Sequence, residues 1–261
     1  MRQRPIADLI DGLRQLGCHI ESQNTLQPHC PPVHLLARGL HGGTCRIAGN
    51  VSSQFLSGLM LAAPYARSTV HLEVTGELVS KPYVVMTSRV MQAFGVDVQI
   101  RDDGGATIAA PQVYRGCDYA IEPDASAASY FFAAAAITGG RARVQGLHRE
   151  ALQGDIAFVD VLARMGCQIS AGNDWLEVQG RAQHGIDIDM NAISDTVQTL
   201  AAVALFADGP TRVRGVAHNR HKETDRIGDL ATELRRLGAE VQEHEDGLTI
   251  VPGPLRPAQI H

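Results

Sequence analysis

The side chains best suited to chemistry lie in residues 218–226, where Lys222, Glu223 and Arg226 carry charge. This stretch follows a β-like run at residues 211–216 and opens a helical pattern of apolar residues that continues to Leu237. Side chains three or four residues apart lie on one face of a helix, so these three charges can converge. Because a helix N-terminus attracts anions, the stretch predicts a site for an anionic ligand. The alternative is a solvated helix start whose charges pair with one another.

Asp195 lies beside Ser194 at the start of another expected helix, residues 194–206. It either caps that helix or serves as a general base in the cleft that holds Lys222. Helix starts in a βαβ arrangement open on the same sheet edge, so we expect Asp195 to approach residues 222–226. His218 and His221 have a spacing that some metal sites use, but no Cys or carboxylate partner stands at a matching offset. The sequence therefore predicts no metal.

Hydroxyl groups stand at two further helix starts. Ser52, Ser53 and Gln54 follow a turn and offer two hydroxyls and an amide, which suits a phosphate ligand. Ser80 and Tyr83 lie around Pro82, a residue favoured in the first helical turn. Ordinary helix capping and an ordinary helix start are the alternatives.

These segments belong to a repeat of about 70 residues. One helix type ends at a glycine and precedes an alternating strand, and the other is rich in small residues and begins with a capping residue. The first type occupies residues 7–16, 84–94, 156–165 and 228–237, and the second occupies residues 52–66, 125–137 and 194–206. The pattern predicts an α/β fold with the small-residue helices buried and the glycine-ended helices amphipathic and outer.

The chain is expected to divide near residue 121, where Ile121, Glu122 and Pro123 break the pattern after a loop and short strand at residues 114–119. Asp124 then caps the next helix. Three small-residue helices accompany four glycine-ended ones, so the first repeat lacks its opening half. Residues 252–261 resemble a turn that leads into a strand. We therefore expect a piece of a longer protein.

Composition excludes several classes of function. The 261 residues are 44% hydrophobic and 20% charged, which suits two globular domains. A net charge of −5 provides no basic surface for nucleic acid or an anionic membrane. Five cysteines without a CxxC spacing indicate a reducing, cytoplasmic location. No dinucleotide-binding, P-loop or serine-hydrolase motif occurs.

Taken together, the motifs resemble the EPSP synthase (3-phosphoshikimate 1-carboxyvinyltransferase) family. The matching segments are Arg4-Pro5-Ile6, Gly49-Asn50-Val51-Ser52-Ser53-Gln54-Phe55-Leu56, Val79-Ser80-Lys81-Pro82-Tyr83, Glu122-Pro123-Asp124-Ala125-Ser126-Ala127-Ala128-Ser129-Tyr130, Gln153-Gly154-Asp155-Ile156 and Lys222-Glu223-Thr224-Asp225-Arg226. The resemblance implies an inside-out α/β fold of βαβαββ units in two lobes. Residues 1–120 would form the later part of the shikimate-3-phosphate-binding domain, and residues 121–261 the earlier part of the second domain.

The resemblance also implies an activity, namely transfer of the carboxyvinyl group of phosphoenolpyruvate to the 5-hydroxyl of shikimate 3-phosphate with release of phosphate. This is a step of the shikimate pathway to chorismate and the aromatic amino acids. It implies no cofactor and no metal, a monomer, and the two small molecules as the only partners.

Residue roles follow from the same resemblance. Those implied to bind shikimate 3-phosphate are Ser52, Ser53, Gln54, Ser80, Tyr83, Asp195, His218 and Lys222, where His218 replaces an Asn of many relatives. Asp195 would deprotonate the 5-hydroxyl beside Lys222, and Glu223 would handle the proton at the methylene carbon. Arg226, with Gln54, would bind phosphoenolpyruvate through its planar guanidinium.

Two alternatives stay open at this point. The sister family that acts on UDP-N-acetylglucosamine shares the fold, although the Ser52-Ser53-Gln54 and 222–226 segments favour shikimate 3-phosphate. The chain could also be an inactive fragment, because the family's amino-terminal lysine, glycine-rich loop and carboxy-terminal arginine and lysine lie outside it. We accordingly expect no turnover by the 261 residues alone.

Overall fold

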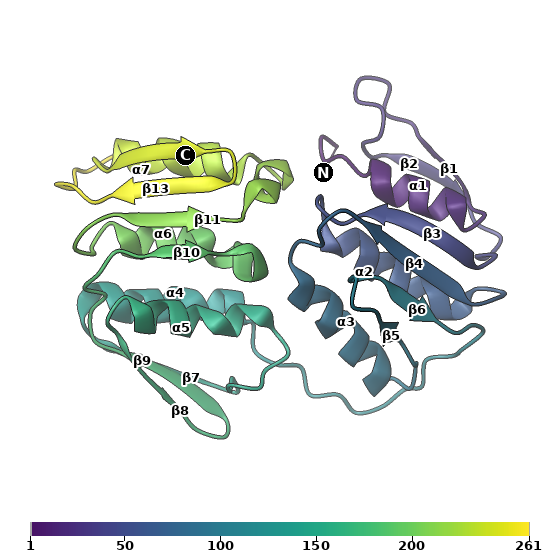
Figure 1. Cartoon of the computed structure of the whole chain (residues 1–261), viewed down its shortest axis with the longest axis horizontal. Helices are drawn as coiled ribbons and strands as arrows, with labels where there is room; N and C mark the ends of the chain where they lie inside the picture. The colour runs from purple at the N-terminus through teal and green to yellow at the C-terminus, as the bar shows by residue number, and fades with distance from the viewer. Residues whose placement is uncertain (1, 261) are drawn as a thin grey trace. The chain divides into compact units, whose positions relative to one another are not determined.

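The computed structural model describes residues 2–260 and divides the chain into two compact units, Met1–Ala120 and Ile121–His261 (Figure 1). The division falls at the break that the sequence shows near residue 121. Residues 109–124 contain neither helix nor strand, so the short strand expected at residues 114–119 is wrong. None of residues 111–124 is buried, and an extended segment there has no core face to pack against. Which substrate each unit serves stays a prediction.

Unit 1 contains a four-stranded sheet, a separate two-stranded sheet and three α-helices. Its elements are α1 (Ala7–Gln15), β1 (His19–Ser22), β2 (Val33–Leu36), β3 (Gly43–Ala48), α2 (Ser53–Ala62), η1 (Ala63–Tyr65), β4 (Val70–Thr75), α3 (Lys81–Ala93), β5 (Gln99–Ile100) and β6 (Ala106–Ile108). The core of this unit lies where α2 and α3 pack beside the four-stranded sheet, around Leu56, Leu59, Met60, Leu72 and Met91.

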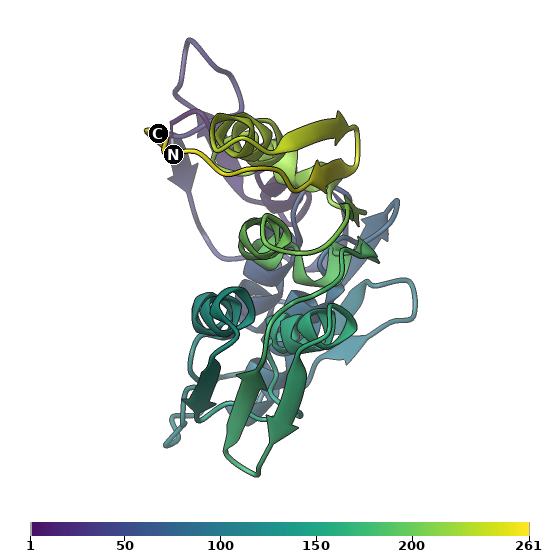
Figure 2. The same ribbon diagram turned by 90° about the vertical axis from the view of Figure 1, so that its left-hand side faces the viewer.

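Unit 2 contains a three-stranded and a four-stranded sheet with four α-helices. Its elements are α4 (Ala125–Thr138), β7 (Arg141–Gln145), η2 (Gly154–Ala157), α5 (Phe158–Arg164), β8 (Gln168–Ala171), β9 (Trp175–Gln179), β10 (Asp187–Asp189), η3 (Asn191–Thr196), α6 (Val197–Ala204), β11 (Thr211–Arg214), η4 (Ala217–His221), α7 (Arg226–Arg236), β12 (Glu240–His244) and β13 (Gly247–Val251). Figure 2 shows the helices of this unit, teal to yellow, nearly end-on beside the strands.

Sheet topology repeats as the sequence predicted. The orders β3-β4-β6-β5 and β10-β11-β13-β12 match strand for strand, and β7-β9-β8 matches their last three positions. In both four-stranded sheets the first two strands pair in parallel, and the other pairs are antiparallel. A small-residue helix, α2 or α6, connects each parallel pair.

A glycine ends each of the helices α1, α3, α5 and α7. Gly17, Gly95, Gly166 and Gly238 have φ angles of 88°, 80°, 110° and 103°, which L-residues with a side chain rarely adopt. Their backbone N–H groups bond to carbonyls in the last turns of the preceding helices. The predicted helix ends at these positions are confirmed.

Small side chains allow α4 and α6 to approach closely in the core of unit 2. Ala128 and Ala136 of α4 and Ala201 of α6 are buried, and the hydroxyls of Ser129 and Thr199 lie 3.0 Å apart between the helices. A β-branched or aromatic residue at these alanines would overpack the contact.

The predicted caps agree with the structure at two helices out of three. The side chain of Ser52 accepts from Gln54 N, and that of Asp124 accepts from Ala127 N at 3.0 Å. The third cap is wrong, because residues 191–196 form the 3₁₀ turn η3 and α6 begins only at Val197, without a side-chain cap.

Residues 252–260 also lack the expected strand. Pro254 and Pro257 have no N–H to donate to a sheet, which disfavours pairing there. Among residues 2–260, no helix combines the length and apolarity needed to cross a membrane.

Candidate functional site

The predicted site residues of unit 2 lie in η3, in η4, in the irregular residues after η4 and at the start of α7. Asp195 lies in η3 after β10, His218 lies in η4 after β11, and Arg226 is the first residue of α7. Because β10 and β11 pair in parallel, the chain leaves both strands at the same edge of the sheet. Lys222 and Glu223 lie in the irregular residues between η4 and α7, outside the helix in which the sequence analysis placed them.

Arg226 is the centre of this group. Its Nη1 donates to Asp195 Oδ1 at 2.9 Å, and its Nη2 donates to Glu223 Oε2 at 2.5 Å. Lys222 Nζ lies 4.0 Å from the same Asp195 oxygen. Burial lowers the pKa of Arg226. Its ion pairs with Glu223 and Asp195 raise the pKa by more, so the net result lies above the ordinary value. The expected approach of Asp195 to residues 222–226 is confirmed.

His218 is nearly inaccessible, with 4% of its surface exposed. Burial, and to a lesser extent the positive charge of Lys222, lower the pKa of its imidazole to about 4, and Asp195 opposes both effects. The side chain is therefore neutral at pH 7 and has one N–H donor and one acceptor nitrogen. Its neighbour Asn219 is fully buried and donates to Ser194 O at 3.1 Å, which joins η4 to η3.

The N-terminus of α7 is occupied by the protein itself. Asp225 Oδ1 accepts from Ile227 N at 3.1 Å and from Gly228 N at 3.0 Å. Its other oxygen accepts from Arg220 Nη1 at 2.7 Å. The prediction that free N–H groups at this helix start favour an anion is therefore wrong, because a capping carboxylate takes two of them.

Unit 1 contains the predicted site residues that carry hydroxyl groups. Ser52 and Ser53 are buried at the start of α2. Ser80 precedes α3, is 2% exposed and has φ +53°, a left-handed conformation that costs free energy in a non-glycine residue. Its carbonyl accepts from Tyr83 N at 3.1 Å, so Ser80 and Tyr83 are held in one turn.

Arg4 is a member of this group that the sequence analysis quoted but gave no role. Its Nη2 donates to Gln54 Oε1 at 2.8 Å, which brings a guanidinium to the start of α2. The two residues are 50 positions apart, and neither spacing nor periodicity could reveal their contact. The only sequence signal was the Arg4-Pro5-Ile6 match itself.

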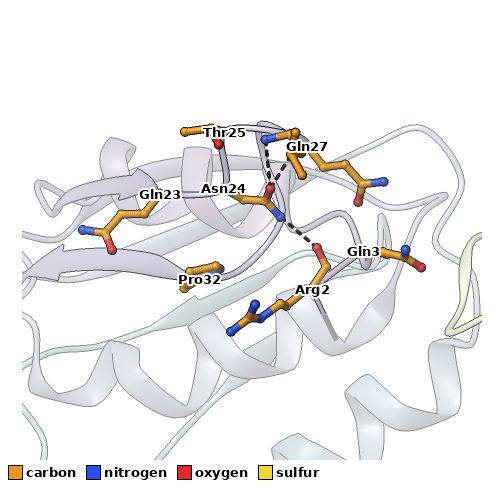
Figure 3. A pocket seen from close by; sticks show the side chains of 8 residues that line it. Arg2, Gln3, Gln23, Asn24, Thr25, Gln27 and Pro32 are labelled. Atoms are coloured by element: carbon orange, nitrogen blue, oxygen red, sulfur yellow. Dashed lines mark hydrogen bonds between the residues drawn. The ribbon is translucent and has the colours of Figure 1, made fainter.

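One cavity of unit 1 lies apart from these groups. A cavity of about 400 Å³ in unit 1 is bounded by none of the predicted residues (Figure 3). There the side chain of Asn24 donates to Arg2 O at 2.9 Å and accepts from Leu26 N and Gln27 N. Within residues 2–260, no three His, Cys, Asp or Glu side chains gather in a way that could hold a metal ion.

Comparison with known proteins decides the family. The sequence profile described as EPSP synthase (3-phosphoshikimate 1-carboxyvinyltransferase) matches residues 1–261. The chain belongs to the EPSP synthase family. A 3-phosphoshikimate 1-carboxyvinyltransferase of Trichormus variabilis is 49% identical over 263 residues, which cover 100% of this chain and 61% of the relative. One of Edwardsiella ictaluri is 47% identical over 262 residues, which cover 100% of this chain and 60% of the relative.

Solved structures show the same EPSP synthase architecture. The EPSP synthase of Acinetobacter baumannii superimposes with a TM-score of 0.71 at 25% identity, over 96% of this chain and 57% of that one. The enolpyruvyl transferase NikO of Streptomyces tendae gives a TM-score of 0.72 at 20% identity, over 96% and 59%, and shows the fold alone. The resemblance drawn from the motifs is confirmed. The chain spans about three fifths of the length of these relatives.

Proposed function

We propose that this chain provides much of an enzyme that transfers the carboxyvinyl group of phosphoenolpyruvate to the 5-hydroxyl of shikimate 3-phosphate and releases phosphate. The observation that carries the proposal is the family match across residues 1–261, together with relatives named for this reaction at 47–49% identity. Neither relative is named as a UDP-N-acetylglucosamine transferase, so they give that alternative no support. The proposed reaction involves no cofactor.

In the proposed mechanism, Asp195 takes the proton of the 5-hydroxyl as that oxygen attacks C2 of phosphoenolpyruvate. Two cations hold the carboxylate of Asp195 in position, Arg226 at 2.9 Å and Lys222 at 4.0 Å. Glu223, once it has taken a proton from water, delivers that proton to the methylene carbon. It removes a proton from the same carbon when phosphate leaves the tetrahedral intermediate, and Asp195 returns the hydroxyl proton to the departing phosphate. This addition and elimination needs positioned acids and bases.

Recognition of the substrates is divided between the two groups of residues. In the proposal, Ser52, Ser53, Ser80 and Tyr83 bind shikimate 3-phosphate in unit 1, since hydroxyls donate well to a phosphate or to ring oxygens. Gln54 contacts both substrates, and the cation of Arg4 at Gln54 adds to the attraction for an anion.

His218 and Lys222 would complete the contacts to shikimate 3-phosphate in unit 2. Arg226 would bind the carboxylate of phosphoenolpyruvate, for which a planar fork of donors is better suited than an ammonium group.

Calorimetric titration of the 261-residue chain with shikimate 3-phosphate tests the proposal. We expect saturable binding that Ser53→Ala weakens. Ser57→Ala is the matched control, because Ser57 lies one turn further along α2 and accepts from Thr87 Oγ1 at 2.8 Å. Absence of binding, or equal binding of UDP-N-acetylglucosamine, would contradict the assignment. A monomeric state and a cytoplasmic location remain predictions for sedimentation and localisation experiments.

A further inference from the structure

Two protein carboxylates occupy the guanidinium of Arg226. Asp195 accepts from Nη1 and Glu223 accepts from Nη2, so both terminal nitrogens donate to acids of the same chain. A carboxylate ligand that binds an arginine side-on needs two parallel N–H donors. An incoming substrate carboxylate that binds both terminal nitrogens therefore competes with these residues for Arg226.

Accessibility distinguishes the two acids. The side chain of Asp195 is 30% exposed and has Lys222, 10% exposed, as a second cation. The side chain of Glu223, which pairs with Arg226, is 52% exposed. An ion pair that solvent reaches is weak, typically below about 1 kcal/mol. Glu223 is accordingly the partner that an entering ligand displaces more easily.

Glu223 can move without disturbing α7. The helix begins at Arg226, and its first N–H groups are capped by Asp225, which Arg220 holds in place. Glu223 lies outside the helix in the irregular residues after η4. Turning its side chain away from Arg226 breaks an ion pair but leaves both capping hydrogen bonds in place.

We propose that Glu223 is an internal competitor for Arg226, which it occupies until the carboxylate of the incoming substrate displaces it and releases it toward the reacting carbon. The inference rests on the proposed function, which supplies phosphoenolpyruvate as that substrate. It couples two events that the mechanism needs in order. Glu223 is a carboxylate while it pairs with Arg226, so after its release it takes a proton from water and can then transfer it to the methylene carbon of the bound substrate.

Competition makes a prediction opposite to that of a simple ligand role. If Glu223 only assisted binding or catalysis, its neutralisation would leave the affinity for phosphoenolpyruvate unchanged or lower it. If it competes for Arg226, Glu223→Gln removes the competing charge and raises the affinity. The expected gain is about 2- to 5-fold, the size of an exposed ion pair that no longer has to be broken.

The measurement is calorimetric titration of the 261-residue chain with phosphoenolpyruvate, for the wild type and Glu223→Gln. The matched control is Glu233→Gln, because Glu233 pairs with Arg236 at 2.7 Å with the same three-residue spacing on α7. This control changes the net charge equally and should leave the affinity unchanged. Inorganic phosphate serves as a second probe, since it lacks the carboxylate and should show no comparable gain.

Each possible result either supports or overturns the inference about Glu223. Tighter binding of phosphoenolpyruvate by Glu223→Gln alone supports the inference, and loss of that gain in Glu223→Gln/Arg226→Gln assigns it to the guanidinium. Unchanged or weaker binding overturns the inference and leaves the proposed function standing. An equal gain for inorganic phosphate also overturns it, because the effect is then general electrostatics. Failure of every form to bind phosphoenolpyruvate overturns both the inference and the proposed binding role of Arg226.

Discussion

Buried His218 should make unit 2 less stable as the pH falls from 7.5 to 5.5. Its imidazole has a pKa of about 4 in the folded chain and an ordinary value of 6.5 when unfolded. Since the folded pKa is the lower one, the unfolded chain binds the proton first. Stability is complete above pH 6.5, declines as the pH falls toward 4, and declines no further below that value.

The size follows from the two pKa values. At pH 5.5 the unfolded histidine is protonated and the folded one is neutral, which costs about 1.4 kcal/mol, and the full loss below pH 4 is about 3.4 kcal/mol. Carboxylates titrate mainly below pH 5. The interval from 7.5 to 5.5 therefore isolates histidines.

Urea unfolding followed by tryptophan fluorescence measures this loss, because the single tryptophan, Trp175, lies on β9 of unit 2. We expect the wild type to lose about 1 to 1.5 kcal/mol between the two pH values. His218→Asn should lose less than about 0.4 kcal/mol, since no buried imidazole is left to titrate. The control His184→Asn alters an exposed histidine of the same unit and should behave as the wild type. An equal loss in His218→Asn and wild type would refute the reasoning.

Three further predictions concern other parts of the chain. Asp225→Ala should lower the stability of unit 2 by about 1–2 kcal/mol in the same assay, because α7 loses its cap; a change below about 0.3 kcal/mol would argue against the cap. In the native chain a maleimide should modify one thiol rapidly, that of exposed Cys117, and Cys117→Ser should remove the rapid phase. The other four cysteines are buried, and burial raises the pKa of Cys45 to about 11. In steady-state kinetics of the full-length enzyme, Asp195→Asn should lower kcat by about 10²–10⁴ with little change in KM, whereas Arg226→Lys should mainly raise the KM for phosphoenolpyruvate. Near wild-type kcat for Asp195→Asn would move the base to Glu223.

Features fixed by local sequence were the ones that could be predicted. A helix that ends at Gly17 or Gly238 needs a left-handed residue at that position, and glycine supplies it wherever the chain goes next. The approach of Asp195 to Arg226 was also predictable, because parallel strands bring the segments that follow them to one edge. Both conclusions use only the order of the elements along the chain.

Features that depend on competition between similar residues could not be predicted. Glu223 and Asp225 both stood near the start of α7, and the sequence did not show that Asp225 would cap the helix and exclude Glu223 from it. The contact of Arg4 with Gln54 joins segments 50 residues apart, and no local pattern encodes it. The start of α6 was misplaced for a related reason, since a 3₁₀ turn and the first turn of an α-helix share the same short-range polar residues.

Charge balance explains why the group in unit 2 can be partly buried and still receive an anion. Asp195 and Glu223 carry two negative charges, and Lys222 and Arg226 carry two positive charges. Neutral His218 leaves the sum at zero, which keeps the desolvation cost of the unliganded group moderate. A carboxylate ligand that displaces Glu223 from Arg226 restores the same balance around the guanidinium, because one negative charge replaces another. A protonated His218 would add a positive charge to the group with or without the ligand. The burial that lowers its pKa keeps the imidazole neutral, so the charges of the group sum to zero before and after the ligand replaces Glu223.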